Sequence, residues 1–269
     1  MGDPNATSPG RRRTAVSIFL PLEHGSWALA LEPLALALLV APSPAGVALT
    51  TAALAGFFAR RPLKAALDPS AADPPRAAQG VLLLFSALAL AGLGGAWLLS
   101  SPAALWPLLL AAPFGGLFIY FDAQGDSRAA LAELAGSAAF AVLPATFATL
   151  AGWRVPAALA LTALALARSI PTVLTVRTYL RLRKGKPARP AVPLLAAALA
   201  LGTIALLAAA HQAPWFAICG PGLLLLRTAW FISARQPAWA AKRVGLAEAI
   251  LGGVYLGCAA IAYLSKGNG

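Results

Sequence analysis

The chain has 269 residues, of which 59% are hydrophobic and only 11% charged, with a mean hydropathy of +0.76. Soluble domains carry charge on roughly a quarter of their residues, so this composition excludes an ordinary soluble domain and indicates a membrane protein. The net charge of +12 lies in short segments between apolar runs, which favours lipid headgroups over nucleic acid as the partner of the basic residues.

Apolar runs that approach the roughly 20 residues needed to cross a bilayer recur along the chain. Because they are rich in Ala and Leu without polar alternation, they predict helices and not the strands of a membrane barrel. We therefore expect an all-α, polytopic bundle of about nine transmembrane helices. Residues 1–16 are predicted to be a disordered cytoplasmic tail, and residues 17–265 a single transmembrane domain. The expected spans are 17–41, 45–59, 80–100, 102–121, 131–151, 155–180, 191–210, 213–233 and 245–264. The short second one is expected either to extend into its neighbours or to sit in a locally thinned bilayer.

The first span opens with a polar stretch, Pro21–Ala28, whose sequence is PLEHGSWA. Glu23 and His24 lie side by side where an apolar helix begins, so they are the candidates for catalytic acid–base groups. A structural histidine with ordinary hydrogen-bond partners is an equally good interpretation of His24. Trp27 is a candidate ligand contact on the same stretch, and Glu32, deeper in the span, has no assigned role.

Arginines at the second and sixth spans are the candidate ligand-binding residues. Arg60 begins a basic segment that follows the second span. Arg168 lies about nine residues, or roughly 13 Å of helix rise, deeper in the sixth span than Arg177. Snorkelling does not bring a guanidinium at that depth to water, so Arg168 is predicted to meet an anion inside the bundle. Arg177 and Arg181 share a helix face near the basic loop and serve either topology or ligand binding.

Three further charged residues lie in or at the ends of spans. Arg227 is expected to snorkel towards water. Glu133 and Glu248 come early in their spans, and a structural role at a helix N-terminus, where the helix dipole favours a carboxylate, is the preferred interpretation.

The distribution of Lys and Arg predicts the orientation in the membrane. If the N-terminus is cytoplasmic, most of the 21 Lys and Arg residues fall in cytoplasmic connections, whereas Arg154 and Lys266 fall outside. This asymmetry predicts a cytoplasmic N-terminus and an external C-terminus.

Three segments together resemble a known family. Pro21–Ala28, with Pro33 after it, resembles the opening PKEHGAWA signature of the YwiC-like family of bacterial integral membrane proteins. Thr172–Arg181 and Lys242–Glu248 resemble later motifs of that family. The resemblance implies a multi-pass protein of the bacterial plasma membrane and no particular reaction.

The first-span motif with Pro33, and the segment Asp126–Gly136, carry a weaker resemblance to the UbiA superfamily of intramembrane prenyltransferases, which implies a UbiA-like arrangement of nine helices. That family holds magnesium with two aspartate-rich motifs on its second and sixth helices. This chain instead has a basic segment that starts at Arg60, and it has Arg177 and Arg181 in the sixth span. A guanidinium cannot ligate magnesium, so no metal site is predicted and the cofactor is unknown.

Three functions are left open by the sequence. The first is binding of an anionic or isoprenoid-like lipid in a cytoplasm-facing basic cavity, with Arg168 and Arg177 on the headgroup and Glu23 and His24 nearby. The second is a divergent UbiA-type prenyl or lipid transferase that lacks the magnesium-binding aspartates and uses Glu23 or His24 as base. A small-anion transporter is the third. Whether the chain is an enzyme is not determined by these patterns.

Overall fold

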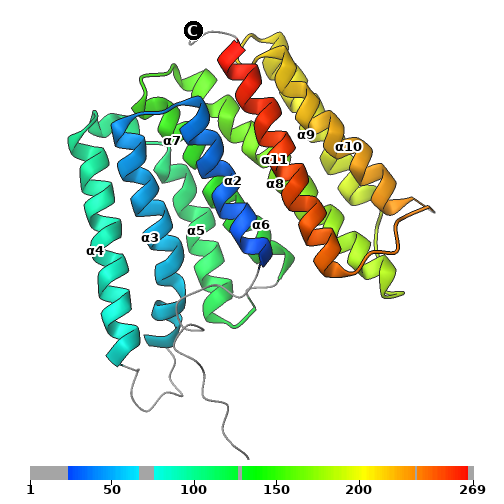
Figure 1. The fold of residues 1–269 in the computed structure, drawn as a ribbon, viewed down its shortest axis with the longest axis horizontal. Coiled ribbons are helices and arrows are strands. Elements are labelled where there is room, and N and C mark those ends of the chain that lie inside the picture. The colour runs from blue at the N-terminus through cyan, green and yellow to red at the C-terminus, as the bar shows by residue number, and fades with distance from the viewer. Residues whose placement is uncertain (1–23, 67–75, 127–128, 234, 266–269) are drawn as a thin grey trace, which may run out of the picture.

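The computed structural model describes residues 24–66, 76–126, 129–233 and 235–265, with the side chains of 24–29 and 76–77 left out. The regular elements of these residues are helices that run side by side along the bundle (Figure 1). In chain order they are α2 (His24–Val40), α3 (Pro44–Ala66), α4 (Arg76–Leu98), η1 (Pro102–Leu105), α5 (Leu108–Ala123), α6 (Ala130–Ala141), α7 (Leu143–Leu150), α8 (Val155–Arg183), α9 (Ala191–Ala209), η2 (Trp215–Ile218), α10 (Cys219–Ile232) and α11 (Ala241–Ser265).

Seven helical segments of the described chain are long and apolar enough to cross a membrane. They are α4, η1 with α5, α6 with α7, α8, α9, η2 with α10, and α11. The other two predicted spans correspond to α2, of which the described apolar part is Ala30–Val40, and to α3, which extends past its apolar run to Ala66. The prediction of an all-α polytopic bundle is confirmed, and the second span does extend as expected.

The long helix α8 lies at the centre of the bundle. It packs against α6, α7, α9, α10 and α11. Pro171 lies near its middle without ending it, and the carbonyl of Pro171 accepts a hydrogen bond of 2.6 Å from Oγ1 of Thr175. The same hydroxyl lies 3.1 Å from Oγ1 of Thr228, which joins α8 to α10.

The helices α3 and α4 form a closely packed hairpin at one edge of the bundle (Figure 1). A Cβ atom at Gly92 of α4 would lie 2.6 Å from the backbone oxygen of Ala48 and 2.6 Å from the backbone nitrogen of Ala52 on α3. Only glycine fits at this crossing, because any side chain would separate the two backbones. The hairpin makes far fewer contacts with the other helices than its two members make with each other.

Aromatic and basic residues distinguish the two ends of the bundle. One end of the bundle holds the last residues of α4 and α7 and the first residues of α5 and α10. Four tryptophans lie at this end: Trp97, Trp106, Trp153 and Trp215. Trp230 and Trp239 lie near the other end. Tryptophans near both ends match the aromatic belts of membrane proteins. We call this second end the basic end, because a group of basic residues also lies near it. They are Arg60, Arg61, Lys64, Arg177, Arg181, Arg183, Lys184, Lys186, Arg189, Arg235, Lys242 and Arg243.

Candidate functional site

A buried ion pair joins α8 to α2 in the middle of the bundle. Nε of Arg168 lies 3.0 Å from Oε2 of Glu32, and Nη2 of Arg168 donates a 3.0 Å hydrogen bond to Oε1 of Glu32. Only 7% of the Arg168 side chain is exposed. This two-point contact matches the planar fork of a guanidinium to the two oxygens of a carboxylate.

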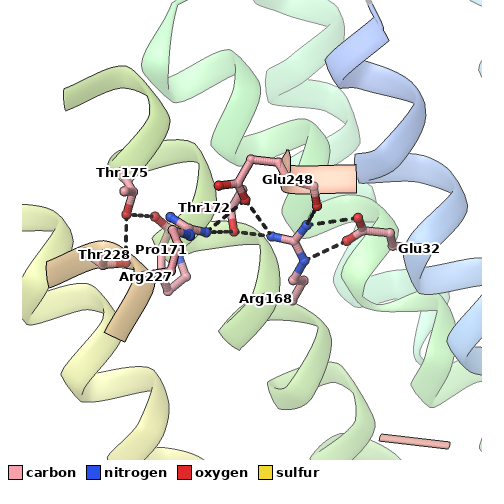
Figure 2. A network of polar contacts seen from close by, with 8 residues as sticks. All are labelled: Glu32, Arg168, Pro171, Thr172, Thr175, Arg227, Thr228 and Glu248. Carbon is pink, nitrogen blue, oxygen red and sulfur yellow. Dashed lines mark hydrogen bonds and ion pairs between the residues drawn. The ribbon is translucent and has the colours of Figure 1, made fainter. Parts of the chain in front are cut away.

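A second carboxylate and a second guanidinium complete the group, which we call the ionic cluster (Figure 2). Nη2 of Arg168 donates to the backbone oxygen of Glu248 on α11 at 2.8 Å, and Oε2 of Glu248 accepts from Nη2 of Arg227 on α10 at 3.0 Å. Oγ1 of Thr172 accepts a hydrogen bond from both guanidinium groups. The ionic cluster is therefore Glu32, Arg168, Arg227 and Glu248, with Thr172 between the arginines, and its formal charges sum to zero.

The ionic cluster confirms that Arg168 meets an anion inside the bundle, and the anion is a pair of carboxylates of the chain itself. Two other expectations were wrong. Arg227 does not snorkel, because it is only 7% exposed and is held by Glu248. Glu248 does not interact with the dipole at a helix N-terminus, because it lies about two turns into α11 and its side chain points into the cluster. The signal that could have paired them was the presence of two Glu and two Arg within apolar runs.

Space around the ionic cluster is very limited. The hollow beside Glu32, Arg168 and Ser169 measures about 10 Å³, which is about the room of one water molecule. A Cβ atom at Gly252 of α11 would overlap Oε1 of Glu32 and would lie 2.9 Å from Nη2 of Arg168. The cluster is thus a close-packed junction of four helices, with no room for a lipid beside the Glu32–Arg168 pair.

A larger cavity lies between α3, α5 and α6, with α2 and α7 closing its inner side. Its volume is about 370 Å³, within the range of roughly 300–1,000 Å³ that is usual for ligand sites. Its walls are apolar apart from Arg60, Glu133 and Ser137. Gly56 of α3 and Gly115 of α5 line it, and a Cβ atom at either would have no neighbour within 4 Å. We call this space the apolar cavity.

Arg60 marks the polar end of the apolar cavity, towards the basic end of the bundle. Nε of Arg60 lies 3.3 Å from Oδ2 of Asp122 on α5, and its guanidinium carbon lies 4.8 Å from the ring centre of Phe118. Stacking on an aromatic face fixes the plane of a guanidinium and keeps its edge available for polar groups. Arg60 is therefore oriented at the point where an apolar wall meets charged groups.

Glu133 lines the same cavity and is paired with Arg177 of α8. Nη1 of Arg177 donates a 2.8 Å hydrogen bond to Oε2 of Glu133. Glu133 lies in the first turn of α6, as expected, where the helix dipole stabilises its negative charge. Arg177 itself is not a lining residue of the cavity, and it contacts the lining through Glu133.

The structure separates the residues that the sequence had grouped into one basic cavity. Arg60 lines the apolar cavity, whereas Arg168 belongs to the ionic cluster. Arg181 lies at the end of α8, where its Nε donates to the backbone oxygen of Pro187 at 2.9 Å. The ligand-binding roles of these arginines stay predictions.

The acid–base pair of the transferase hypothesis falls outside the described residues. Glu23 precedes them, and α2 begins at His24 with the side chains of His24 and Trp27 likewise outside the description. Within the described part of the chain, no three His, Cys, Asp or Glu residues gather as metal ligands would.

Comparison with known proteins gives one match. A family model described as "YwiC-like protein" matches residues 20–146. No curated protein and no solved structure matches the chain. The matched range contains Glu32 and all the residues that line the apolar cavity, whereas Arg168, Arg227 and Glu248 lie beyond it.

Proposed function

We propose that the chain is a member of the YwiC-like family, whose model matches residues 20–146, and that it takes a single amphipathic lipid from the bilayer into the apolar cavity. The hydrocarbon part of the lipid, isoprenoid-like or acyl, lies along the walls of α3, α5 and α6. The polar headgroup lies at Arg60. The multi-pass architecture supports this function, since α5, α6 and α7, which line the cavity together with α2 and α3, belong to segments long and apolar enough to cross a membrane.

The observation that carries the proposal is the glycine-lined opening of the cavity. Gly56 is exposed on α3 and Gly115 is half-buried on α5, and no side chain closes the space in front of either backbone. In a bilayer, such an opening between two helices faces acyl chains, because the surrounding surface of α4 and α5 is apolar and exposed. A lipid chain can enter sideways without crossing a polar surface.

We place the basic end of the bundle on the cytoplasmic side of a bacterial plasma membrane. The described basic residues concentrate at that end, and short cytoplasmic loops are enriched in Lys and Arg. Arg60 and the polar end of the cavity then lie towards the cytoplasmic leaflet, whose anionic lipids are attracted by basic residues near the surface. The lipid is therefore drawn from that leaflet.

A cavity-filling substitution tests the proposal. Gly115→Leu places a bulky side chain in the cavity, whereas Gly116→Leu adds the same side chain one residue later on α5, outside the cavity. Native mass spectrometry of protein purified in mild detergent should show a retained lipid in the wild type and in Gly116→Leu. In Gly115→Leu the retained fraction should fall about tenfold, which corresponds to ~1.4 kcal/mol of binding.

The control variant separates binding from folding. Both leucine variants should unfold at similar temperatures, because neither glycine has a neighbour that a Cβ atom would disturb. Equal retention of lipid by the two variants would contradict the proposed site.

A further inference from the structure

Charged side chains from four helices meet around the polar end of the apolar cavity. On α3, Nζ of Lys64 donates to the backbone oxygen of Asp122 at 3.0 Å and lies 3.6 Å from its Oδ1. Arg60 contacts the other carboxylate oxygen of Asp122 through Nε. Glu133 of α6 and Arg177 of α8 form the second pair. These five side chains carry three positive and two negative charges, so one positive charge is in excess where the apolar wall ends.

Asp122 shows which chemical group the two cations of α3 accept. It is only 7% exposed, and both of its carboxylate oxygens face a cation, Arg60 on one side and Lys64 on the other. A carboxylate or phosphate of a lipid offers the same oxygens to a guanidinium. The chain's own carboxylate therefore marks an anion position at the end of the cavity.

The position of Asp122 on its helix makes its carboxylate exchangeable. Asp122 lies in the last turn of α5, where the helix dipole disfavours a negative charge. Lys64 has a second partner there, the backbone oxygen of Asp122, and a cation is favoured at a helix C-terminus. Arg60 can thus change its carboxylate partner while Lys64 continues to hold the end of α5.

Arg60, and not Lys64, is placed to meet a bound lipid. Arg60 lines the cavity and is stacked on Phe118, whereas the Lys64 side chain is 51% exposed and is not a lining residue. A stacked guanidinium has a fixed plane and presents several donors towards one anion, so it loses little side-chain freedom on binding. Recognition of the headgroup is assigned to Arg60 for this reason.

We propose that the apolar cavity selects lipids with an anionic headgroup, a carboxylate or a phosphate, and that this headgroup takes Arg60 from Asp122. This inference rests on the proposed function and gives its ligand a charge. A lipid with an uncharged head would fill the same cavity but would leave Arg60 on Asp122. Selectivity between headgroups then comes from the polar end of the cavity, and affinity for the hydrocarbon tail of the lipid comes from the apolar walls.

Three single-chain amphiphiles with one hydrocarbon tail test the inference: oleyl phosphate, oleate and oleyl alcohol. Each is titrated into the full-length, delipidated protein in a non-ionic detergent, and binding is measured by native mass spectrometry. The wild type should bind the two anions about tenfold more tightly than the alcohol. The order of oleyl phosphate and oleate then shows whether the site is better matched to a phosphate or to a carboxylate.

Three charge-neutralising variants show which residue contacts the headgroup. Arg60→Gln should lose the preference for anions, so that its affinity for oleyl phosphate and oleate falls about tenfold, towards its affinity for oleyl alcohol. Lys64→Gln removes an equal charge from the same helix and the same partner, but it should keep most of the preference because an exposed charge is screened by salt. Asp122→Asn should bind both anions more tightly, since it frees Arg60. A loss of folding common to the variants would lower binding of all three amphiphiles together.

The outcomes separate this inference from the proposed function. Equal binding of the three amphiphiles by the wild type, or an unchanged preference in Arg60→Gln, would overturn the anion selectivity and leave lipid binding in place. Binding of all three that is unaffected by Gly115→Leu would overturn the cavity as the site.

Discussion

Single residues decide whether four charges can be buried together in the ionic cluster. Arg168 pairs with Glu32 at two points, and Glu248 joins Arg168 to Arg227. Removing one partner of a buried ion pair typically costs about 3–5 kcal/mol, because the other charge stays buried without compensation. The junction of α2, α8, α10 and α11 thus depends on each of its members.

Gly252 provides the closest test of this junction. Gly252→Ala drives a methyl group into the Glu32–Arg168 contact and should lower the free energy of unfolding by about 1–3 kcal/mol. Gly253→Ala is the matched control, because a Cβ atom there has no neighbour within 4 Å. In the control, alanine in place of glycine within a helix should be neutral or stabilising by about 0.5–1 kcal/mol. Thermal unfolding of the purified variants in detergent measures the difference, and similar behaviour of the two would refute the role of Gly252.

At the scale of elements, the α3–α4 hairpin is the unit that borders the apolar cavity. Its two helices touch at Gly92, and α3 is joined to α5 through Arg60, Lys64 and Asp122 at the basic end. The cavity lies where α3 and α5 are not in close contact. The packing of α3 on α4 therefore sets the position of one cavity wall.

Gly92→Ala should disturb that packing. The added methyl group meets two backbone atoms of α3, which cannot rotate away as a side chain would, so the helices must separate. Overpacking of this kind usually costs about 1–3 kcal/mol. The melting temperature of the Gly92→Ala variant should fall, and that of Gly94→Ala should not, because a Cβ atom at Gly94 meets nothing within 4 Å. A similar decrease in both variants would show that the crossing tolerates a side chain.

At the scale of the whole molecule, charge and aromatic residues define two unlike ends. Arg154 lies between α7 and α8 at one end, and Lys186 lies between α8 and α9 at the other, among the other basic residues. The long helix α8 separates them by the thickness of the bundle. The two positions are suited to report on which end faces the cytoplasm.

Cysteine accessibility measures that orientation. In a background with Cys219→Ser and Cys258→Ser, Arg154→Cys should react with a membrane-impermeant maleimide in intact cells, and Lys186→Cys should react only after permeabilisation. The expected direction follows from the enrichment of basic residues in cytoplasmic loops. Labelling of Lys186→Cys alone in intact cells would reverse the orientation and put the polar end of the cavity outside.

Local composition is enough to predict the spanning helices and the demand of Arg168 for an anion. Both follow from local composition, because a bilayer forces the backbone of an apolar run into helices and penalises an uncompensated charge wherever it lies in a span. The short second run was also recognised as extending further, and α3 does reach Ala66.

Which residues meet depends on how the helices pack together. The partners of Arg168 lie 136 and 80 residues away, and their identity depends on how α2, α8 and α11 rotate and cross. Arg227 could not be placed from its run for the same reason, since depth along a helix says nothing about which face is buried. The apolar cavity depends in turn on a gap between α3 and α5 that no local pattern records. Hydropathy along one helix fixes where it lies in the bilayer, whereas neighbours, pairs and cavities are set by the packing of several helices against one another.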